Sequence, residues 1–401
     1  MHCTKELKKG LFWVGGSDRK LHRFESQYPI PRGVSYNAYV LMDEKTVLLD
    51  TVDQSISGQF LENLDHVLAG RSLDYLVVNH MEPDHCATVG DVVRRHPETT
   101  LVCNQKTVPM LEQFFGAAAT KNLLLVKEGD TLCTGGHTLT FVMMPMVHWP
   151  EAMVTYDVTD KTLFSADAFG SFGALNGHLF ADEVHFETEW LSDARRYFTN
   201  IVGKYGTPVQ SILKKAGGLE ISMICPLHGP VWRKDFGWIL DKYQRWSTCT
   251  PEDQAVVIYY ASVYGNTENA AQILAMELAN QGVEDVRLYD TAVTHVSELA
   301  GEAFRASHLV FAAPTIDGGV FPAMDTLLHH LAAHALHDRT VAVMDNGTWA
   351  PTAAKQMTQQ LSTMKNMKVL EPAISLKSSV KEGDRQQLSA LAAAIAADLK
   401  A

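Results

Sequence analysis

The second half of the chain alternates between β-prone and helix-prone segments, and this alternation constrains the fold more than any other feature. Strands are expected at residues 255–260, near Val286, at 309–313 and at 340–344. Helices are expected at 268–280, after Pro322, after Pro351 and from about Arg385 onward. Such alternation is typical of a doubly wound parallel sheet, whose ligands bind at the carboxyl ends of the strands.

The first half of the chain has a different pattern. Its β-prone runs are short and bounded by Gly, Asp, Asn and Pro, and they lie at residues 47–49, 75–78, 123–126, 139–143 and 153–156. A helical segment at 59–68 separates two of these runs, so a mixed, layered α+β domain is expected. The polar stretch 246–254 separates the two patterns and predicts two domains, residues 1–248 and 254–401.

Composition excludes several classes of protein. The chain has 401 residues, of which 46% are hydrophobic and 20% charged, as in ordinary globular proteins. A formal net charge of −12 argues against nucleic acid or an anionic membrane as the partner, because phosphate groups require clustered Lys and Arg. Neither a signal peptide nor an apolar run of about 18 residues is found, so we expect a cytoplasmic protein without a membrane span. The six cysteines include no C-x-x-C pair, and neither a disulfide framework nor a rubredoxin-type iron site is predicted.

Residues 77–85 read Val-Val-Asn-His-Met-Glu-Pro-Asp-His, an apolar strand that leads into a loop rich in metal ligands. Because alternate residues of an extended segment share one side, His80, Glu82 and Asp84 are predicted to point to one place. A solvated acidic loop is the alternative. Three more ligand-type residues each follow a short strand-like run, and they are His148, Asp167 and His228. Ligands at strand ends converge on one edge of a sheet, which favours a metal site.

The motif His-x-Glu-x-Asp-His, followed by His148, Asp167 and His228 at these separations, resembles the metallo-β-lactamase-like core of the flavodiiron proteins. This resemblance implies an αββα sandwich that holds two irons. It further implies the ligands: His80, Glu82 and His148 for one iron, Asp84 and His228 for the other, and Asp167 as the bridge. The related zinc hydrolases generally have a second His where this chain has Glu82, and the carboxylate makes a harder, more anionic site.

Two further residues enter the predicted site through the same resemblance. His85 is a ligand in the hydrolases but is typically not coordinated in the flavodiiron family, so we expect it beside the ligands. Tyr197 resembles a tyrosine that lines the diiron pocket, although a packed aromatic on an amphipathic helix is an equal alternative from the pattern alone.

The second domain opens with a strand, a loop of small and hydroxyl-bearing residues, and a helix. Such a loop offers backbone N–H groups, hydroxyls and a helix N-terminus to a phosphate. It contains neither Gly-Lys-Ser/Thr nor Gly-x-Gly-x-x-Gly, so a Walker loop and a dinucleotide site are excluded. The sequence Ser-x-Tyr-Gly-Asn-Thr at 262–267 instead resembles the FMN-phosphate loop of flavodoxins, with a structural capping loop as the alternative.

The flavodoxin resemblance places two further FMN-contacting loops at the ends of strands 309–313 and 340–344. It implies a flavodoxin-like doubly wound parallel sheet and a set of FMN-binding residues: Ser262, Tyr264, Gly265, Asn266, Thr267, Pro314, Thr315, Ile316, Asp317, Gly318, Asn346, Gly347, Thr348 and Trp349. The family more often has Asn in place of Asp317 and Ser-x-Gly-Trp in the third loop, so the individual ring contacts stay open.

The resemblance covers both domains in family order and implies an oxidoreductase dependent on FMN and two irons. Dioxygen reduced to water, or nitric oxide reduced to nitrous oxide, is the implied reaction. Implied partners are a separate electron donor, such as rubredoxin, a flavin reductase or a reduced deazaflavin, and a second copy in a head-to-tail homodimer or a dimer of dimers. The alternatives are a zinc hydrolase with a regulatory flavin domain and a non-catalytic electron carrier. The carrier would require a broken ligand position, and the sequence has none.

Overall fold

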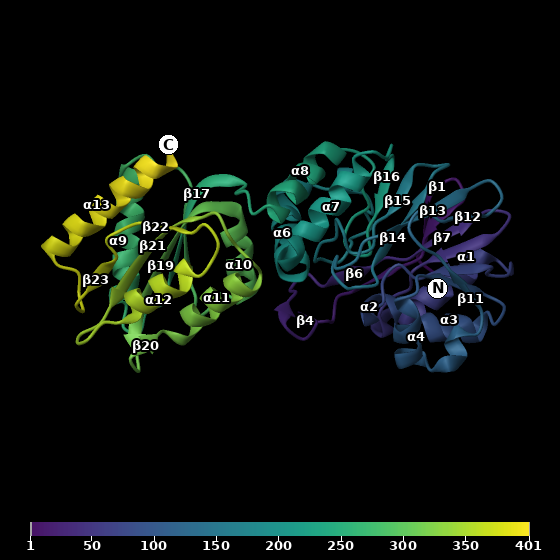
Figure 1. Ribbon diagram of the computed structural model, residues 1–401, viewed down its shortest axis with the longest axis horizontal. Coiled ribbons are helices and arrows are strands. Elements are labelled where there is room, and N and C mark those ends of the chain that lie inside the picture. Colours follow the sequence, from purple (N-terminus) through teal and green to yellow (C-terminus); the bar gives the residue numbers. More distant parts are fainter. Residues whose placement is uncertain (1, 401) are drawn as a thin grey trace. The chain divides into compact units, whose positions relative to one another are not determined.

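The computed structural model describes residues 2–400, apart from the side chains of residues 118 and 119. Met1 and Ala401, the outer limits of the two predicted domains, lie outside the described residues. The chain forms two compact units (Figure 1). One contains the residues up to Phe198 together with Tyr205–Tyr243, and the other contains Thr199–Lys204 and the residues from Gln244 onward. Within residues 2–400, no helix has the length and apolar character needed to cross a membrane.

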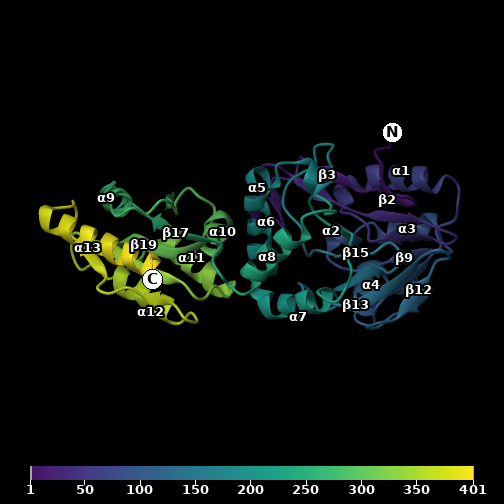
Figure 2. The same ribbon diagram turned by 90° about the horizontal axis from the view of Figure 1, so that it is seen from above.

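The first unit contains a seven-stranded mixed sheet. In sheet order its strands are β1 (Lys5–Lys8), β2 (Leu11–Trp13), β7 (Tyr39–Met42), β8 (Thr46–Leu49), β9 (Tyr75–Val77), β10 (Thr100–Cys103) and β11 (Leu123–Leu125). The strands from β1 to β8 are antiparallel, and those from β8 to β11 are parallel. Parallel neighbours need crossover connections, which contain α1 (Ser57–Leu68), α3 (Val89–Arg95) and α4 (Thr107–Phe115). Figure 2 shows α1 running along this sheet, where it packs against β7.

A second sheet of five strands completes this unit. Its order is β12 (Thr131–Cys133), β13 (Thr138–Met143), β14 (Met153–Asp157), β15 (Thr162–Phe164) and β16 (Met223–Cys225). Its last two strands are parallel, and α5 (Phe186–Glu189), α6 (Leu191–Tyr197) and α7 (Gly206–Ala216) connect them. Every residue of β14 is buried, as expected for a strand covered on both faces. The predicted metallo-β-lactamase-like αββα sandwich is confirmed.

Two short hairpin-like pairs flank the sheets. The strand β3 (Gly16–Asp18) pairs with β6 (Val34–Tyr36), and β4 (Arg23–Phe24) pairs with β5 (Tyr28–Pro29). Helix α8 (Phe236–Ser247) belongs to the first unit up to Tyr243 and to the second unit from Gln244 onward. It includes Trp246 and Ser247, which the sequence placed in a polar linker. The indole of Trp246 is fully buried and donates a hydrogen bond to Glu252, so packing extends the helix into the polar stretch.

The second unit is a parallel sheet in the order β18 (Val286–Asp290), β17 (Asp253–Tyr260), β19 (Ala306–Ile316) and β21 (Thr340–Asn346). Strands β22 (Lys368–Val369) and β23 (Ile374–Leu376) both pair with β21, and β20 (Gly319–Val320) turns back on β19. Counted along this unit, the order is 2-1-3-4-5, the flavodoxin-like arrangement of a doubly wound sheet. The predicted fold is therefore confirmed.

Helices cover both faces of this parallel sheet (Figure 1). Helices α9 (Asn266–Asn280) and α13 (Glu382–Leu399) pack together on one apolar core with β17, β19 and β21. Helices α10 (Val296–Arg305), α11 (Pro322–Ala333) and α12 (Ala353–Ser362) form the other layer. Helix α9 begins two residues before the predicted position, so Asn266 and Thr267 lie in its first turn.

The buried Asn37 side chain ties the first sheet to the loop that follows β16. Its amide donates to the carbonyl oxygens of Pro226 and Gly229, both at 2.9 Å, and its oxygen accepts the Trp13 indole N–H at 2.9 Å. The Trp13 indole N–H and the Gly229 carbonyl therefore depend on this one side chain, whereas the Pro226 carbonyl also accepts the Tyr39 hydroxyl at 2.7 Å.

We predict that Asn37→Ala lowers the free energy of unfolding by about 3 kcal/mol, because buried donors and acceptors are left without partners. Chemical denaturation measures this effect. Asn176→Ala is the matched control, because Asn176 is exposed and its side-chain oxygen accepts a hydrogen bond from Arg19 at the surface. A loss below about 0.5 kcal/mol for Asn37→Ala, the range of ordinary surface substitutions, would contradict the prediction.

Candidate metal centre and flavin pocket

The six predicted metal ligands lie at one edge of the sandwich, where strands of both sheets end. His80 and Glu82 follow β9, His148 follows β13, Asp167 follows β15 and His228 follows β16. Asp84 lies on the short helix α2 (Pro83–Cys86). All six side chains are buried. Strand ends from two layers thus bring together residues that lie up to 148 positions apart in the sequence, from His80 to His228.

The prediction that the ligand segment stays extended through Asp84 is wrong. Pro83 begins helix α2, a position that suits proline because its fixed φ fits the first helical turn. The chain therefore turns after Glu82, and Asp84 and His85 project from a helical turn. This turn directs Asp84 to a second cluster of ligand atoms, separate from that of His80 and Glu82.

The first cluster consists of His80, Glu82, His148 and Asp167. The Nε2 atom of His148 lies 2.9 Å from Glu82 Oε2 and 3.2 Å from Asp167 Oδ2. The Nε2 atom of His80 lies 3.4 Å from Glu82 Oε2 and 3.2 Å from the same Asp167 oxygen. Two imidazole nitrogens and two carboxylates thus converge, a mixed donor set that suits divalent iron or zinc.

The second cluster consists of Asp84, His85 and His228. Asp84 Oδ2 lies 3.3 Å from His85 Nε2 and 3.2 Å from His228 Nε2. The two Nε2 atoms are 3.0 Å apart. From the sequence we expected His85 to lie beside the ligands. In the structure, its Nε2 atom lies among the donor atoms, because α2 turns the imidazole toward His228.

Asp167 connects the two clusters. Its Oδ2 atom faces His80 and His148, while its Oδ1 atom lies 3.1 Å from His85 Nε2 and 3.7 Å from His228 Nε2. The carboxylate follows Ala166, whose φ of 50° is left-handed, and precedes a tight turn at Phe169 and Gly170. A Cβ on Gly170 would lie 3.0 Å from the Tyr197 ring, so glycine permits the close approach. One carboxylate is thereby presented to two sites at once.

Several buried polar atoms of this centre lack hydrogen-bond partners within the described residues. They are His80 Nε2, both oxygens of Asp84 and both oxygens of Asp167. Buried polar groups without partners are rare in folded proteins, and buried carboxylates need a compensating positive charge. These atoms of His80, Asp84 and Asp167 face the interior of the two clusters, where metal ions would bind, so the donor set fits a pair of metal ions.

In the metal-free centre, the closely packed imidazoles and carboxylates shift one another's pKa values. Burial alone would lower the pKa of His148, but the carboxylates of Asp167 and Glu82 close to its Nε2 atom raise this pKa to about 9. Burial opposes the charge of Asp167 as well, yet the surrounding imidazoles hold its pKa well below the usual value. Without metal, protons on the imidazoles therefore supply the positive charge that the carboxylates require.

Tyr197 is fully buried beside this centre. Its ring centroid lies 5.4 Å from that of His228 and 5.2 Å from that of Phe172. Its hydroxyl has no hydrogen-bond partner among residues 2–400. Burial, followed by the charge of Asp167, raises the pKa of Tyr197 well above its usual value. The hydroxyl is therefore a neutral, unused hydrogen-bond donor next to the metal ligands.

A cavity of about 300 Å³ opens onto the centre and is lined by Glu82 and Asp84, one residue from each cluster. Glu25, at the tip of the β4–β5 hairpin, lines it as well, and both Glu25 and Ser26 have left-handed backbones with φ of 47° and 58°. Burial and a hydrogen bond shared with Glu82 raise the pKa of Glu25 to about 8. Glu25 was not predicted from the sequence, because nothing in the local sequence shows that this hairpin reaches the ligands.

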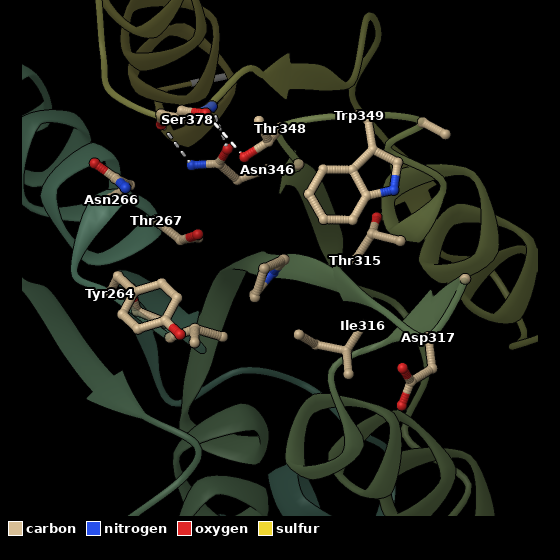
Figure 3. Close-up of a pocket in the computed structure, with 16 residues that line it drawn as sticks. Tyr264, Asn266, Thr267, Thr315, Ile316, Asp317, Asn346, Thr348, Trp349 and Ser378 are labelled. Carbon is tan, nitrogen blue, oxygen red and sulfur yellow. Dashed lines mark hydrogen bonds between the residues drawn. The ribbon is translucent and has the colours of Figure 1, made fainter.

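A second site lies at the switch point of the parallel sheet, at the carboxyl ends of β17 and β19. It is a cavity of about 400 Å³ between the loops that follow β17, β19 and β21. Figure 3 shows Tyr264 and Thr267 on one side of an open space, Thr315 and Ile316 on the other, and Asn346 near Ser378. All predicted FMN residues except Gly265 line this cavity.

Gly265 shapes the first loop rather than the cavity wall. Its φ of 85° is left-handed, and its N–H donates to the Ser262 hydroxyl at 3.0 Å. Ser378, which follows β23, was not predicted but also lines the cavity. Its backbone N–H donates to Asn346 Oδ1 and its carbonyl accepts from Asn346 Nδ2, both at 2.9 Å, so it holds Asn346 in place. Only the tertiary pairing of β23 with β21 brings it there.

The cavity suits a flat ring with a phosphate. Tyr264 and Trp349 are 92% and 81% exposed, so their rings do not pack in the protein core and are available to a planar ligand. The α9 N-terminus, with Asn266 and Thr267, offers backbone N–H groups and a hydroxyl of the kind that bind phosphate. Asp317 is the only charged side chain among the described residues that line the cavity.

The fold and the two sites define a class: a metallo-β-lactamase-like domain with two adjoining clusters of potential metal ligands, joined in one chain to a flavodoxin-like domain. Comparison with known proteins agrees. The family described as ODP family beta lactamase matches residues 34–229. The anaerobic nitric oxide reductase flavorubredoxin of Pectobacterium atrosepticum is 31% identical over 368 residues, which cover 89% of this chain and 70% of that protein.

Two solved structures are similar over nearly the whole chain. The flavodiiron protein from Giardia intestinalis has a TM-score of 0.94 and 25% identity, and covers 100% of this chain and 97% of its own. The rubredoxin oxygen:oxidoreductase from Desulfovibrio gigas has a TM-score of 0.91 and 27% identity, and covers 99% of each chain. The chain belongs to the flavodiiron protein family. Membership of this family supports an oxidoreductase class for the chain.

The raised pKa of His148 predicts how metal affinity changes with pH. Its value of about 9 lies above the ordinary histidine value, so the stability it adds to the metal-free protein is present below about pH 6.5 and is lost as pH rises through 9. A metal ion that binds His148 must displace the proton from its imidazole. We predict that the apparent zinc affinity of the metal-free protein rises about tenfold per pH unit between pH 7 and 9.

Competition with a chelator, corrected for the chelator's own protonation, measures this slope. His329→Gln is the control, because His329 is exposed and belongs to no group of potential metal ligands among the described residues. An affinity that does not change over this pH range would contradict the prediction.

Proposed function

We propose that this chain is an FMN- and diiron-dependent oxidoreductase that reduces dioxygen to water, nitric oxide to nitrous oxide, or both. The observation that carries the proposal is the orientation of Asp167, whose two oxygens face two separate clusters of buried ligands. A bridging carboxylate is how dinuclear centres hold metals roughly 3.5–4 Å apart. The names of the similar proteins, a nitric oxide reductase and an oxygen:oxidoreductase, support both gases.

The proposed ligands are assigned from the two clusters. His80, Glu82 and His148 would hold one iron, Asp84 and His228 the other, and Asp167 would bridge them. His85 also has its Nε2 atom within the second cluster, and we propose that it either completes this site or lies directly behind an open position. Three carboxylates among the ligands favour iron, because hard oxygen donors suit a metal that alternates between ferrous and ferric states.

When bound, the two irons would supply electrons to the gas. Four electrons and four protons convert dioxygen into two waters, and two electrons and two protons convert two nitric oxides into nitrous oxide and water. The chain's own residues would provide the surroundings for this reaction. The neutral Tyr197 hydroxyl is placed to donate a hydrogen bond to the reduced gas, and the cavity lined by Glu25, Glu82 and Asp84 offers a route to the centre.

The flavin would be held in the second unit. Thr267 and Asn266, in the first turn of α9, would receive the phosphate, and Ser262 and Tyr264 would complete that loop. Thr315, Asn346 and Gly347 would surround the ring, with Trp349 beside it. Because no lysine or arginine among the described residues lines the cavity, neutral N–H and hydroxyl donors would carry phosphate recognition.

The remaining proposals concern location and partners. We propose that residues 1–248 form the diiron domain and residues 254–401 the FMN domain, that the protein works in the cytoplasm, and that neither a membrane nor nucleic acid is its partner. A separate donor, such as rubredoxin, a flavin reductase or reduced deazaflavin, would reduce the flavin. A head-to-tail homodimer or a dimer of dimers would place one subunit's flavin beside the partner's irons.

The Thr267 hydroxyl provides a test of phosphate recognition. We predict that Thr267→Val weakens FMN binding about 10- to 100-fold, because a hydrogen bond to a charged group contributes roughly 1.5–3 kcal/mol. Fluorescence titration of the flavin-free protein measures the affinity. Riboflavin lacks the phosphate and is the matched control ligand, and its affinity should stay the same. An equal loss for both flavins would place the phosphate elsewhere.

Metal and flavin analysis followed by anaerobic reduction tests the proposed function. We expect two irons and one FMN per chain, and rapid reoxidation when the reduced protein meets dioxygen or nitric oxide. The faster oxidant identifies the preferred gas. Zinc in the centre, or iron that neither gas reoxidises, would reject the reductase and favour the alternative, a zinc hydrolase of the metallo-β-lactamase superfamily with a regulatory flavin domain.

A further inference from the structure

The imidazoles of the metal centre differ in the hydrogen-bond partner of Nδ1, the ring nitrogen that faces away from the ligand cluster. The Nδ1 atom of His80 lies 2.9 Å from the carboxylate of Glu151. The Nδ1 atom of His228 lies 2.8 Å from the backbone carbonyl of Ser35. The Nδ1 atom of His85 is buried and has no hydrogen-bond partner within the described residues. In the first cluster, a histidine ligand is therefore hydrogen-bonded to a negatively charged carboxylate. In the second cluster, His228 is hydrogen-bonded to a neutral carbonyl and His85 Nδ1 has no partner.

Glu151 is held firmly in this position. Only 1% of the residue is exposed, and its Oε1 atom also accepts the Met81 N–H at 2.8 Å. Its backbone carbonyl accepts the Asn104 side-chain amide at 2.6 Å, which fixes the chain next to Pro150. The second oxygen, Oε2, is buried without a partner. Among the described residues, the only ion-pair partner of the Glu151 carboxylate is His80.

Two consequences follow for His80. The hydrogen bond to Glu151 fixes the proton on Nδ1, so that Nε2 presents its lone pair to the ligand cluster. The carboxylate also makes the imidazole a stronger electron donor than a carbonyl partner would. A stronger donor favours the more highly charged ferric ion over the ferrous ion.

We propose that Glu151 is a positioning residue that makes the two irons unequal, so that the iron bound by Asp84 and His228 is reduced before the iron bound by His80. This inference rests on the proposed diiron function. The first electron from the flavin would convert the ferric ion of the Asp84 and His228 cluster to ferrous, and the second would convert the other ion. No bond is broken in either step, and the His80–Glu151 proton stays on Nδ1.

The test is a redox titration of the iron-loaded protein, followed by electron paramagnetic resonance and Mössbauer spectroscopy. The wild type should show two separate one-electron steps. Glu151→Gln removes the charge but keeps an oxygen that accepts from both His80 Nδ1 and the Met81 N–H. We expect it to retain two irons per chain, to raise the potential of the second step and to bring the two steps closer together.

Asp157→Asn is the matched control. Asp157 is a buried carboxylate in the same unit that accepts from His137 Nδ1 at 2.7 Å; with Asp160 these two residues form a separate group of potential ligands outside both clusters of the centre, so the iron content of this variant is measured as well. Its substitution should leave both steps unchanged. A purely structural role of Glu151 would lower iron content or folding stability without moving the potential, so the potential separates the two roles.

The outcomes distinguish this inference from the proposed function. A wild type that binds fewer than two irons would reject the diiron proposal itself. A wild type with two irons, together with a Glu151→Gln variant whose steps do not move, or an equal shift in Asp157→Asn, would overturn the inference alone. If Glu151→Gln does not fold, the wild type still decides: after one-electron reduction the ferrous Mössbauer signal should come from the iron beside Asp84 and His228, and a ferrous iron beside His80 at this stage would overturn the inference.

Discussion

The interaction on which the rest of the metal centre depends is that of the Asp167 carboxylate with imidazoles from two directions. A carboxylate that is 1% exposed is costly to bury unless positive charge surrounds it. Here each of its oxygens faces a different pair of histidines. The arrangement requires strand ends from both sheets, a left-handed residue before Asp167 and a glycine after it. The two-layer fold is thus what makes a bridged pair of sites possible.

The same logic explains which parts of this centre could be predicted from sequence. His148, Asp167 and His228 each follow a short apolar run, and strand ends of one sandwich meet at one edge, so their convergence could be expected. The placement of His85 could not, because it depends on helix α2, which Pro83 begins inside a segment that otherwise alternates like a strand. Glu151 and Glu25 lie 71 and 55 positions from His80, and only tertiary packing shows that they reach the ligands.

In the flavin pocket, too, some residues could be predicted from the sequence and others could not. The strict alternation of strands and helices predicted the doubly wound sheet, and the observed order 2-1-3-4-5 places the loops after β17 and β19 at its switch point. The loop residues near Thr267 and Asn346 were therefore accessible to sequence reasoning. Ser378 was not, because its role depends on β23 pairing with β21 and on two hydrogen bonds to Asn346.

The central claim is that one buried carboxylate bridges two metal sites, and anomalous X-ray diffraction at the iron absorption edge tests it most directly. Crystals of the iron-loaded protein should give two anomalous peaks roughly 3.5–4 Å apart, one on each side of Asp167. The first peak should lie among His80, Glu82 and His148, and the second beside Asp84 and His228. A single peak, or a second peak that does not contact Asp167, would contradict the account.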